Sequence, residues 1–388
     1  MDMDAFFASI EQREDPSLMG HPVAITNGQH GRMLITCSYE ARAYGLYTTM
    51  PVWEAKQRCP TLIVLPSRLS YYTEVSNQMI AFIQQVISPE VDVFSIDEMF
   101  IRLSLVGFDA GLPEIISMLH RKIYRAFKLP ISMGVAHNKT NAKYATQLNK
   151  PMGISIIPPR EAAAFLANLP VDVICGIGKG LKRMFAKHGI HTCGQVKQLP
   201  ISILSKRFGT PGRILWHQCQ GEDITPFIMN NKPQKTVSSS KVMPPNVTSS
   251  DDALFFLAFI AHELASKLVV LKKKAVRYQM TLVFDRKYAR QKMEVPGVPT
   301  QSCLTLLASL KVFFKEALIS HRSLSYISIE SDRLSDDQQG HLLAGQQNES
   351  VQQVLSVINK VFGKQAIVSA RLIPNQHQQV ASKDLKRR

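Results

Sequence analysis

Short apolar runs alternate with one longer helical pattern over the first part of the chain. Pro22–Ile25 and Met33–Thr36 are rich in apolar and β-branched residues, which predicts two strands. Apolar positions recur at helical spacing over residues 71–88, and the alternation from Val91 to Leu103 is typical of a β-hairpin. We therefore expect a mixed α/β region that ends near residue 158.

Two further regions follow, each with its own pattern. Residues 160–230 give short helical signals punctuated by glycine and proline, which indicates a small all-helical domain. The polar stretch 231–235 lacks periodicity and is a credible linker. Beyond it we expect strand, helix, strand, strand, helix and strand, at residues 236–242, 251–272, 275–284, 289–295, 300–317 and 325–329. This order is typical of a two-layer α+β domain, so the whole chain is expected to be a multidomain α+β protein.

The composition is that of a globular protein. Of the 388 residues, 45% are apolar and 20% are charged, which excludes wholesale disorder and fibrous classes. The six cysteines form no Cys-x-x-Cys pair, so neither a disulfide framework nor a zinc site is expected, even at His191, Cys193, His217 and Cys219. No uninterrupted apolar window approaches the ~18 residues of a membrane span. The N-terminus lacks the basic residues of a signal peptide, so we expect a cytoplasmic protein without a membrane partner.

Charge is distributed unevenly along the chain. The net charge is +16, which favours a polyanionic partner such as nucleic acid. Residues 1–98 carry 6 Lys and Arg against 12 Asp and Glu, whereas residues 171–241 carry 11 against 3. This segregation is expected if the acids hold metal ions while the basic part binds phosphates, and the alternative is ordinary solvated surface charge.

Acidic residues lie on two segments that are otherwise apolar. Asp2-Met3-Asp4 opens one predicted strand, and Ser95-Ile96-Asp97-Glu98 lies at the turn of the predicted hairpin. Carboxylates from two neighbouring strands are suitable ligands for Mg²⁺ ions that activate a 3′-hydroxyl and stabilise a leaving pyrophosphate. The alternative is that each acid is a satisfied turn or surface residue.

Four motifs follow one another in a fixed order: Asp2–Glu11, Thr36–Arg42, Ser95–Glu98 and a last one from Ser132 to Gly153. Together they resemble the motifs of Y-family DNA polymerases, with bacterial DNA polymerase IV as the nearest type. The resemblance implies a right-hand polymerase with a mixed α/β palm, small fingers, a helical thumb and a βαββαβ little finger. The implied boundaries are palm 1–8 and 68–158, fingers 9–67, thumb 159–230, linker 231–235, little finger 236–335, and clamp-binding peptide, terminal helix and basic tail 336–388.

The same resemblance implies a template-directed, Mg²⁺-dependent translesion polymerase of low fidelity and without proofreading. Its catalytic carboxylates would be Asp2, Asp97 and Glu98, and with the main-chain carbonyl of Met3 they would hold two Mg²⁺ ions. Asp4 is not a ligand in the family pattern.

Further positions match the family's substrate contacts. The incoming triphosphate would be held by Tyr39, Arg42 and Lys143. Phe7 matches the steric gate that excludes ribonucleotides, and the roof over the templating base would be Met33 and Ile35. Arg supplies a planar fork and Lys a point charge, and both can neutralise charge during phosphoryl transfer.

Two elements would bind DNA, and a third would bind a sliding clamp. The thumb contains a sequence similar to a helix-hairpin-helix, whose DNA-phosphate contacts would be Gly176, Gly178 and Lys179. The little finger adds cations near its strands, and because none of them suggests base readout, we expect binding that is independent of sequence. The clamp-binding residues would be Gln339, Leu342 and Leu343, where a glycine stands in place of the preferred leucine; a disordered linker is the alternative.

One departure from the family pattern keeps an alternative function open. Family members usually have several apolar residues before Asp-Met-Asp, whereas this chain begins one residue before Asp2, so either the start is misassigned or the first strand is truncated. A short strand would fray, and the position of Asp2 depends on it. The main alternative is therefore a catalytically impaired DNA-binding protein of the same fold, and a nucleotidyl cyclase is disfavoured by the basic thumb and little finger.

The expected partners are primer–template DNA, dNTPs and the clamp, and the protein is expected to be a monomer associated with the nucleoid.

Overall fold

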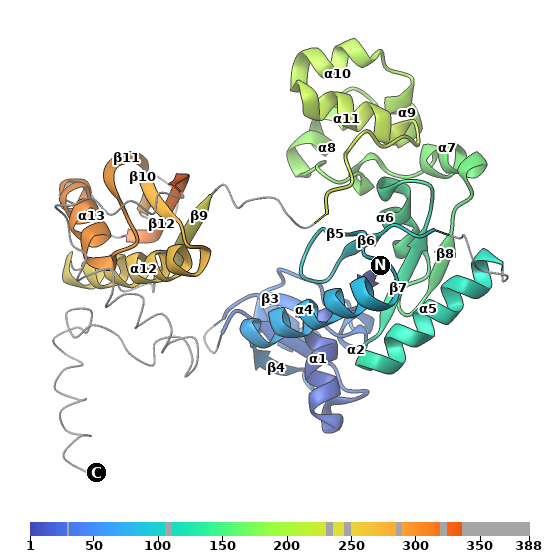
Figure 1. The fold of residues 1–388 in the computed structure, drawn as a ribbon, viewed down its shortest axis with the longest axis horizontal. Helices are drawn as coiled ribbons and strands as arrows, with labels where there is room; N and C mark the ends of the chain where they lie inside the picture. Colours follow the sequence, from blue (N-terminus) through green and yellow to red (C-terminus); the bar gives the residue numbers. More distant parts are fainter. Residues whose placement is uncertain are drawn as a thin grey trace. The chain divides into compact units, whose positions relative to one another are not determined.

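The computed structural model describes residues 1–28, 31–104, 111–229, 236–243, 250–284, 289–318 and 324–335. The chain divides into two compact units, Met1–Lys232 and a second that begins at Pro233 (Figure 1). Each unit has its own hydrophobic core, and the sites discussed below lie in the first unit unless stated otherwise.

A very short first strand joins two small sheets of the first unit. The elements are β1 (Asp2–Met3), β5 (Val91–Val93), β6 (Met99–Ile101), β7 (Ile131–Val135) and β8 (Ile154–Ile156). Three of them form a sheet in the order β1-β7-β8, and β5 and β6 form the predicted antiparallel hairpin. On one edge of β1 the N–H of Met3 donates to the carbonyl of Asp97 (2.9 Å), and on the other the N–H of Asp4 donates to that of Pro130 (2.9 Å). The position of Asp2 is therefore fixed by backbone bonds on both sides, although the strand has only two residues.

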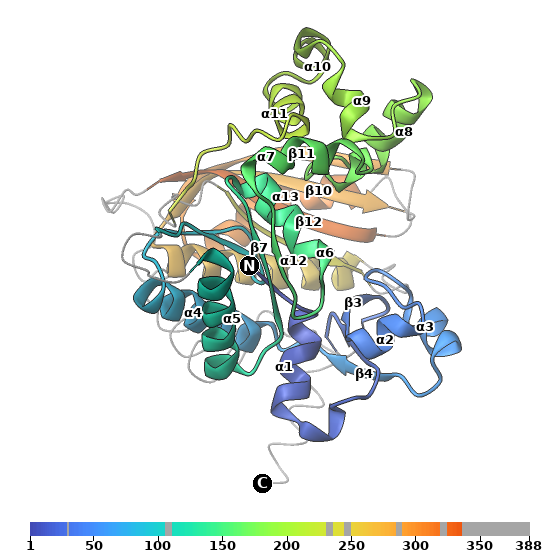
Figure 2. The same ribbon diagram turned by 90° about the vertical axis from the view of Figure 1, so that its right-hand side faces the viewer.

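Two helices cover one face of this arrangement. They are α4 (Leu69–Val86) and α5 (Leu112–Phe127), which lie close together in Figure 2 and touch through an edge-to-face contact between Phe82 and Phe127 (5.5 Å). Beneath them the buried side chains of Met3, Met99 and Ile131 point into the same core. Because side chains alternate along a strand, Asp2, Glu98 and Ser132 point to the opposite face.

A second small sheet carries the region that the sequence assigns to the fingers. Its order is β3-β2-β4, from β2 (Val23–Thr26), β3 (Leu34–Cys37) and β4 (Ile63–Pro66). The helices of this region are α1 (Phe6–Glu14), η1 (Pro16–Leu18), α2 (Tyr39–Ala43) and α3 (Val52–Arg58). The strands predicted at residues 22–25 and 33–36 are confirmed as the antiparallel pair β2 and β3.

Short helices make up the rest of the first unit, as the glycine and proline punctuation predicts. They are α6 (Lys139–Leu148), α7 (Pro159–Ala167), η2 (Val171–Val173), α8 (Lys179–Lys187), α9 (Cys193–Lys197), α10 (Ile201–Phe208) and α11 (Thr210–Cys219). Their shared core includes Phe185, Leu204 and Leu215, together with the buried thiols of Cys193 and Cys219.

The second unit confirms the predicted βαββαβ order. Its elements are β9 (Val237–Val242), α12 (Ser250–Leu271), β10 (Lys274–Phe284), β11 (Ala289–Thr300), α13 (Cys303–Leu318) and β12 (Leu324–Ser335), and its sheet order is β11-β10-β12-β9. The third strand of this unit was expected to end before Pro296, whereas β11 continues to Thr300. A register shift between Ala275 and Arg277 of β10 accommodates this, since an edge strand tolerates proline at an irregularity.

Helix α12 is apolar because it forms the core of this unit. The helical segment 253–271 could cross a membrane by its length and composition alone, and its mean hydropathy is 1.9. Leu257, Ile260 and Leu264 are fully buried against the sheet, and Glu263 accepts a hydrogen bond from Ser239 of β9 (2.6 Å). The packing therefore accounts for the composition. The predicted clamp-binding peptide and terminal helix, in residues 336–388, lie outside the described residues.

Candidate active site in the first unit

Asp2 and Glu98 stand opposite each other in an antiparallel bridge. The N–H of Met3 donates to Asp97 on one side of this bridge, and the N–H of Met99 donates to Met1 (3.1 Å) on the other. Asp2 and Glu98 are therefore a non-hydrogen-bonded pair, the type whose Cα atoms are only ~4.5 Å apart and whose side chains lie closest. The fold thus brings together two of the three predicted carboxylates on one face.

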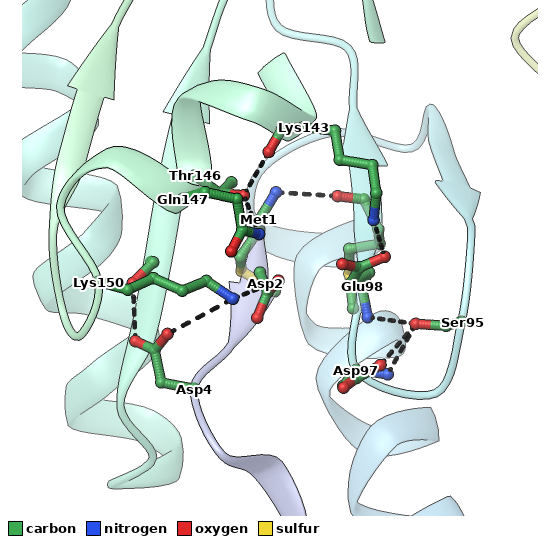
Figure 3. A network of polar contacts seen from close by, with 12 residues as sticks. Met1, Asp2, Asp4, Ser95, Asp97, Glu98, Lys143, Thr146, Gln147 and Lys150 are labelled. Carbon is green, nitrogen blue, oxygen red and sulfur yellow. Dashed lines mark hydrogen bonds and ion pairs between the residues drawn. The ribbon is translucent and has the colours of Figure 1, made fainter. Parts of the chain in front are cut away.

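Each of these two carboxylates has a lysine partner. The Nζ atom of Lys150 lies 2.6 Å from Oδ2 of Asp2, and Lys143 donates to Oε2 of Glu98 (Figure 3). Burial raises the pKa of the Glu98 carboxyl; the ion pair with Lys143 opposes this shift and the neighbouring Asp2 adds to it. The face therefore concentrates negative charge that needs nearby cations.

The third predicted carboxylate, that of Asp97, has a different orientation. Its Oδ1 accepts a hydrogen bond from the hydroxyl of Ser95 (2.5 Å) in the hairpin turn, and that hydroxyl also accepts from the N–H of Glu98 (3.0 Å). Figure 3 shows the Asp97 side chain beside Ser95 and apart from Asp2. Among the described residues, no group of three or more His, Cys, Asp or Glu side chains converges as a metal site. The predicted trio is thus brought together only in part.

Asp4 is fully buried and connects the palm to the fingers region. Its Oδ2 accepts from the hydroxyl of Ser132 (2.7 Å) and from the N–H of Met152 (2.8 Å), and its Oδ1 accepts from the hydroxyl of Tyr39 (3.4 Å). Lys150 lies 3.9 Å from the same carboxylate. Through these contacts Asp4 anchors the segments that carry Ser132, Met152 and Tyr39 to one another.

Tyr39 and Arg42 lie close together on the short helix α2, Tyr39 as its first residue and Arg42 in its last turn. The helix begins because the side chain of Ser38 caps it, accepting from the N–H of Ala41. The guanidinium of Arg42 lies over the ring of Tyr39, 4.6 Å from its centroid, and Nε of Arg42 donates to the carbonyl of Cys37 (3.2 Å). Burial, aided by the negative charge of Asp4, raises the pKa of Tyr39 to about 12, so the hydroxyl stays protonated. Through Asp4, both residues are linked to the acidic face.

Sequence reasoning missed Lys150 as a site residue. Its motif was recognised, but a lysine beside a turn is usually a solvated surface cation. Here only 18% of its side chain is exposed, and it lies between Asp2 and Asp4. The signal that could have identified it is the pair of acids Asp2 and Asp4, in and just after β1, which need a cation when they are buried.

The predicted steric gate, Phe7, and the predicted roof residues, Met33 and Ile35, differ in how far they are buried. The ring of Phe7 is half-buried and stacks on that of Tyr72 (centroids 4.4 Å apart, planes 18° apart), whereas Phe6 is buried in the core. Ile35 is half-buried and packs in the same cluster as Phe7. Met33 is 45% exposed.

The predicted phosphate-binding turn precedes helix α8. Gly176 has a φ of +98°, a conformation that favours glycine, and Gly178 is the N-cap of α8, whose first residue is Lys179. A Cβ atom added at either glycine would meet no atom within 4 Å, so the backbone of this turn is open to a ligand. The N–H of Cys175 donates to the hydroxyl of Tyr144 in α6 (3.1 Å), which fixes the turn to the rest of the unit.

A cavity of about 750 Å³ lies away from the acids. Its walls include Ile101, Met133 and Val135 of the strands and Ile116 of α5, which belong to the face opposite Asp2 and Glu98. The predicted catalytic carboxylates therefore do not line this cavity.

The donor atoms of the acidic face fit a hard divalent cation. Asp2 and Glu98 supply carboxylate oxygens, and the backbone of Met3 faces the hairpin, where its N–H is bonded to Asp97. Carboxylate and carbonyl oxygens are the ligands that Mg²⁺ prefers. Lys143 and Lys150 supply the positive charge in the structure, so bound metal would take over part of their electrostatic role.

Two family models match segments of the first unit. The impB/mucB/samB family matches residues 1–147, and a model described as the DNA polymerase-iota thumb domain matches residues 172–223. The second segment contains helix α8 and begins just before the turn with Gly176.

Curated relatives named DNA polymerase IV cover most of the chain. The protein of Alkalilimnicola ehrlichii is 32% identical over 270 residues, 69% of this chain and 76% of the relative. The protein of Shigella flexneri is 33% identical over 289 residues, 74% of this chain and 82% of the relative. Among solved structures, a chimera of the Y-family DNA polymerases Dbh and Dpo4 has the same fold, with a TM-score of 0.76 at 23% identity, covering 87% of this chain and 98% of the chimera.

Proposed function

The chain belongs to the Y family of DNA polymerases and is a translesion DNA polymerase of the DNA polymerase IV type, and from this premise we propose how its residues carry out nucleotide addition. The observation that carries the proposal is the opposed pair Asp2 and Glu98, with Lys143 beside it and Tyr39 and Arg42 connected to it through Asp4. The domain boundaries set out above are part of the proposal.

We assign Asp2, Asp97, Glu98 and the carbonyl of Met3 to two Mg²⁺ ions. When bound, the ions would promote deprotonation of the primer 3′-hydroxyl and neutralise charge on the leaving pyrophosphate. Asp2 and Glu98 already share a face, and Asp97 lies one residue away on the hairpin turn. For Asp97 to join them, its carboxylate would exchange the hydrogen bond from Ser95 for a metal contact, a rotation within one short side chain.

Lys143, Arg42 and Tyr39 bind the incoming triphosphate in this proposal. Lys143 lies beside the acids, and 22% of its side chain is exposed. Arg42 is held over Tyr39 with its Nε bonded to the backbone, an orientation that leaves the guanidinium nitrogens available. Cations fixed in this way stabilise the negative charge that develops on the phosphates.

Phe7, Met33 and Ile35 define the space for the nucleotide and the template. The stack on Tyr72 holds the Phe7 ring in place, as a steric gate against a 2′-hydroxyl requires. Ile35 of β3 packs in the Phe7 cluster, and the exposed Met33 directly precedes β3, which supports a role for both in covering a templating base.

Two parts of the protein would bind the phosphate backbone of DNA. They are the turn at Gly176, Gly178 and Lys179 and the sheet of the second unit. Among the cations near the little-finger strands, Arg277 is paired with Asp332, whereas Arg286 and Lys287 lie outside the described residues. Such contacts predict affinity that falls with salt and does not depend on sequence. We further propose that the protein acts as a cytoplasmic, nucleoid-associated monomer of low fidelity without proofreading.

Gln339, Leu342 and Leu343 remain the proposed clamp contact. Deleting residues 336–388 should leave distributive primer extension intact and remove stimulation by a sliding clamp. Stimulation that survives the deletion would assign clamp binding to another part of the chain.

Primer extension on an abasic template tests the proposed function. Extension that requires Mg²⁺ and continues past the lesion is expected. DNA binding without incorporation would instead support a catalytically impaired DNA-binding protein. The backbone bonds on both edges of β1 favour the polymerase, because they fix Asp2 despite the short strand.

A further inference from the structure

An exposed aromatic surface lies on the fingers region, outside the reaction site described above. Trp53 is 65% exposed, Tyr47 is 52% exposed and Tyr44 is 53% exposed. Tryptophan is among the side chains most buried on average, so one this exposed, with two exposed tyrosines near it in sequence, is a candidate contact for a ligand.

The backbone connects this surface to the proposed roof over the templating base. The N–H of Thr49 donates to the carbonyl of Leu34 (2.8 Å), and the N–H of Val52 donates to that of Arg32 (2.9 Å). Between these bonds Met33 is paired with Pro51. Tyr47 and Trp53 therefore lie in sequence on either side of Pro51, the residue opposite Met33. Trp53 belongs to α3, which Figure 2 shows at the outer edge of the first unit beyond α2.

The charge around these aromatic residues is positive, although the first 98 residues are acidic overall. Residues 32–58 hold four of the six cations of that segment, against two of its twelve acids. Three of the cations, Arg32, Lys56 and Arg58, lie outside the proposed triphosphate site, and the fourth is Arg42 of that site; all four are exposed. One acid, Glu54, is paired with Arg58 (2.7 Å). Exposed aromatic rings among cations form the type of surface that binds single-stranded nucleic acid, in which bases stack on the rings and the cations attract the phosphates.

We propose that Tyr47 and Trp53, with the surrounding cations, form a stacking platform for unpaired template ahead of the templating base. The platform rests on the proposed function, since a single-stranded template is its ligand. Every base has a π-face, so the platform would hold the template strand regardless of its sequence or of a lesion within it. A protein partner is the alternative occupant, but the positive charge favours a polyanion.

Binding measured without nucleotide or metal ion tests this proposal. Fluorescence anisotropy would compare a primer–template with an eight-nucleotide 5′ overhang and one with a single-nucleotide overhang, both bearing thymidines. Base–aromatic stacking is worth roughly tenfold in affinity per base. We expect the wild type to prefer the long overhang, and the Tyr47→Ala, Trp53→Ala double variant to lose that preference by one to two orders of magnitude while binding the short overhang as the wild type does.

Two controls make the result specific. Tyr124→Ala removes another exposed tyrosine beside a cation, on α5, and should retain the overhang preference. Trp53→Phe keeps a ring and should retain most of the preference, while losing the quenching of tryptophan fluorescence that stacking on Trp53 produces. Unchanged overhang preference in the double variant would overturn the platform and assign the surface to a protein partner; an equal loss in Tyr124→Ala would also overturn it. If the wild type extends primers but does not prefer the long overhang, only the platform is contradicted. If it prefers the long overhang but does not extend primers, only the proposed function is contradicted.

Discussion

Lys143 of helix α6 donates to the carboxylate of Glu98, 45 residues earlier in the sequence, and its Nζ lies 4.4 Å from the centroid of the Phe94 ring. The same ammonium group thus has a fixed position beside the acidic face before any nucleotide binds. A cation held in this way can pass from a carboxylate to an arriving triphosphate without a large change in conformation.

Replacement of this cation should weaken nucleotide binding. Lys143→Ala is expected to raise KM for the incoming dNTP more than it lowers kcat, because the charge is proposed to lie on the triphosphate. Lys143→Arg keeps the charge and should recover part of the loss. Steady-state kinetics on an undamaged template measure both constants; an unchanged KM in Lys143→Ala would refute the assigned role.

The two adjacent phenylalanines should respond differently to truncation. Phe7→Ala removes a half-buried ring and should admit ribonucleotides by orders of magnitude, with a modest loss of deoxynucleotide incorporation. Phe6→Ala removes a ring that is 3% exposed and should cost about 3–5 kcal/mol of unfolding free energy without changing sugar selectivity. Competition between rNTP and dNTP measures the first effect and urea unfolding the second. If Phe7→Ala discriminates as the wild type does, another residue is the gate.

Asp4 should contribute to stability through its hydrogen bonds. Asp4→Ala leaves the hydroxyls of Ser132 and Tyr39 and the N–H of Met152 without this acceptor. Ser132 is fully buried, and a buried unsatisfied group costs about 1–3 kcal/mol of unfolding free energy. Glu74→Ala, an exposed acid on α4, should stay within about 0.5 kcal/mol of the wild type. Equal unfolding free energies for the two variants would contradict the anchoring role.

The turn before α8 offers a matched pair of glycines. A methyl group at Gly178 or at Gly180 would meet no protein atom within 4 Å, and neither position has a positive φ, so neither Gly178→Ala nor Gly180→Ala should strain the fold. Gly178→Ala should nonetheless lower duplex affinity, because the methyl group occupies space that the phosphate backbone needs. Gly180→Ala, inside the helix, should stabilise it by up to about 1 kcal/mol and leave affinity unchanged. Titration of labelled duplex at two salt concentrations distinguishes them, and equal affinities would remove this turn from the DNA interface.

The sequence predicted the elements well where periodicity was strong. The helix at residues 71–88, the hairpin and the βαββαβ unit were all recognised, because their alternation reflects burial on one face. The placement of two-residue β1 between two sheets could not be predicted, since two residues have no periodicity and their partners are distant in sequence. The acids were recognised from their motifs. The orientation of Asp97, however, depends on a hydrogen bond from the hydroxyl of Ser95, and a sequence motif does not show which hydrogen bonds its side chains form. Lys150 was missed because its burial arises from the tertiary fold.

The most direct test of the account compares two glutamates on the same hairpin. Glu98→Gln removes the charge opposite Asp2, whereas Glu90→Gln removes a charge that is paired with Arg102 at the other end of the hairpin. Single-turnover incorporation with saturating Mg²⁺ and dNTP, together with DNA affinity, would be measured for both. We expect Glu98→Gln to lose incorporation by at least two orders of magnitude with DNA affinity unchanged, and Glu90→Gln to retain both. Incorporation by Glu98→Gln at the wild-type rate would contradict the assignment of Asp2 and Glu98 as the catalytic pair.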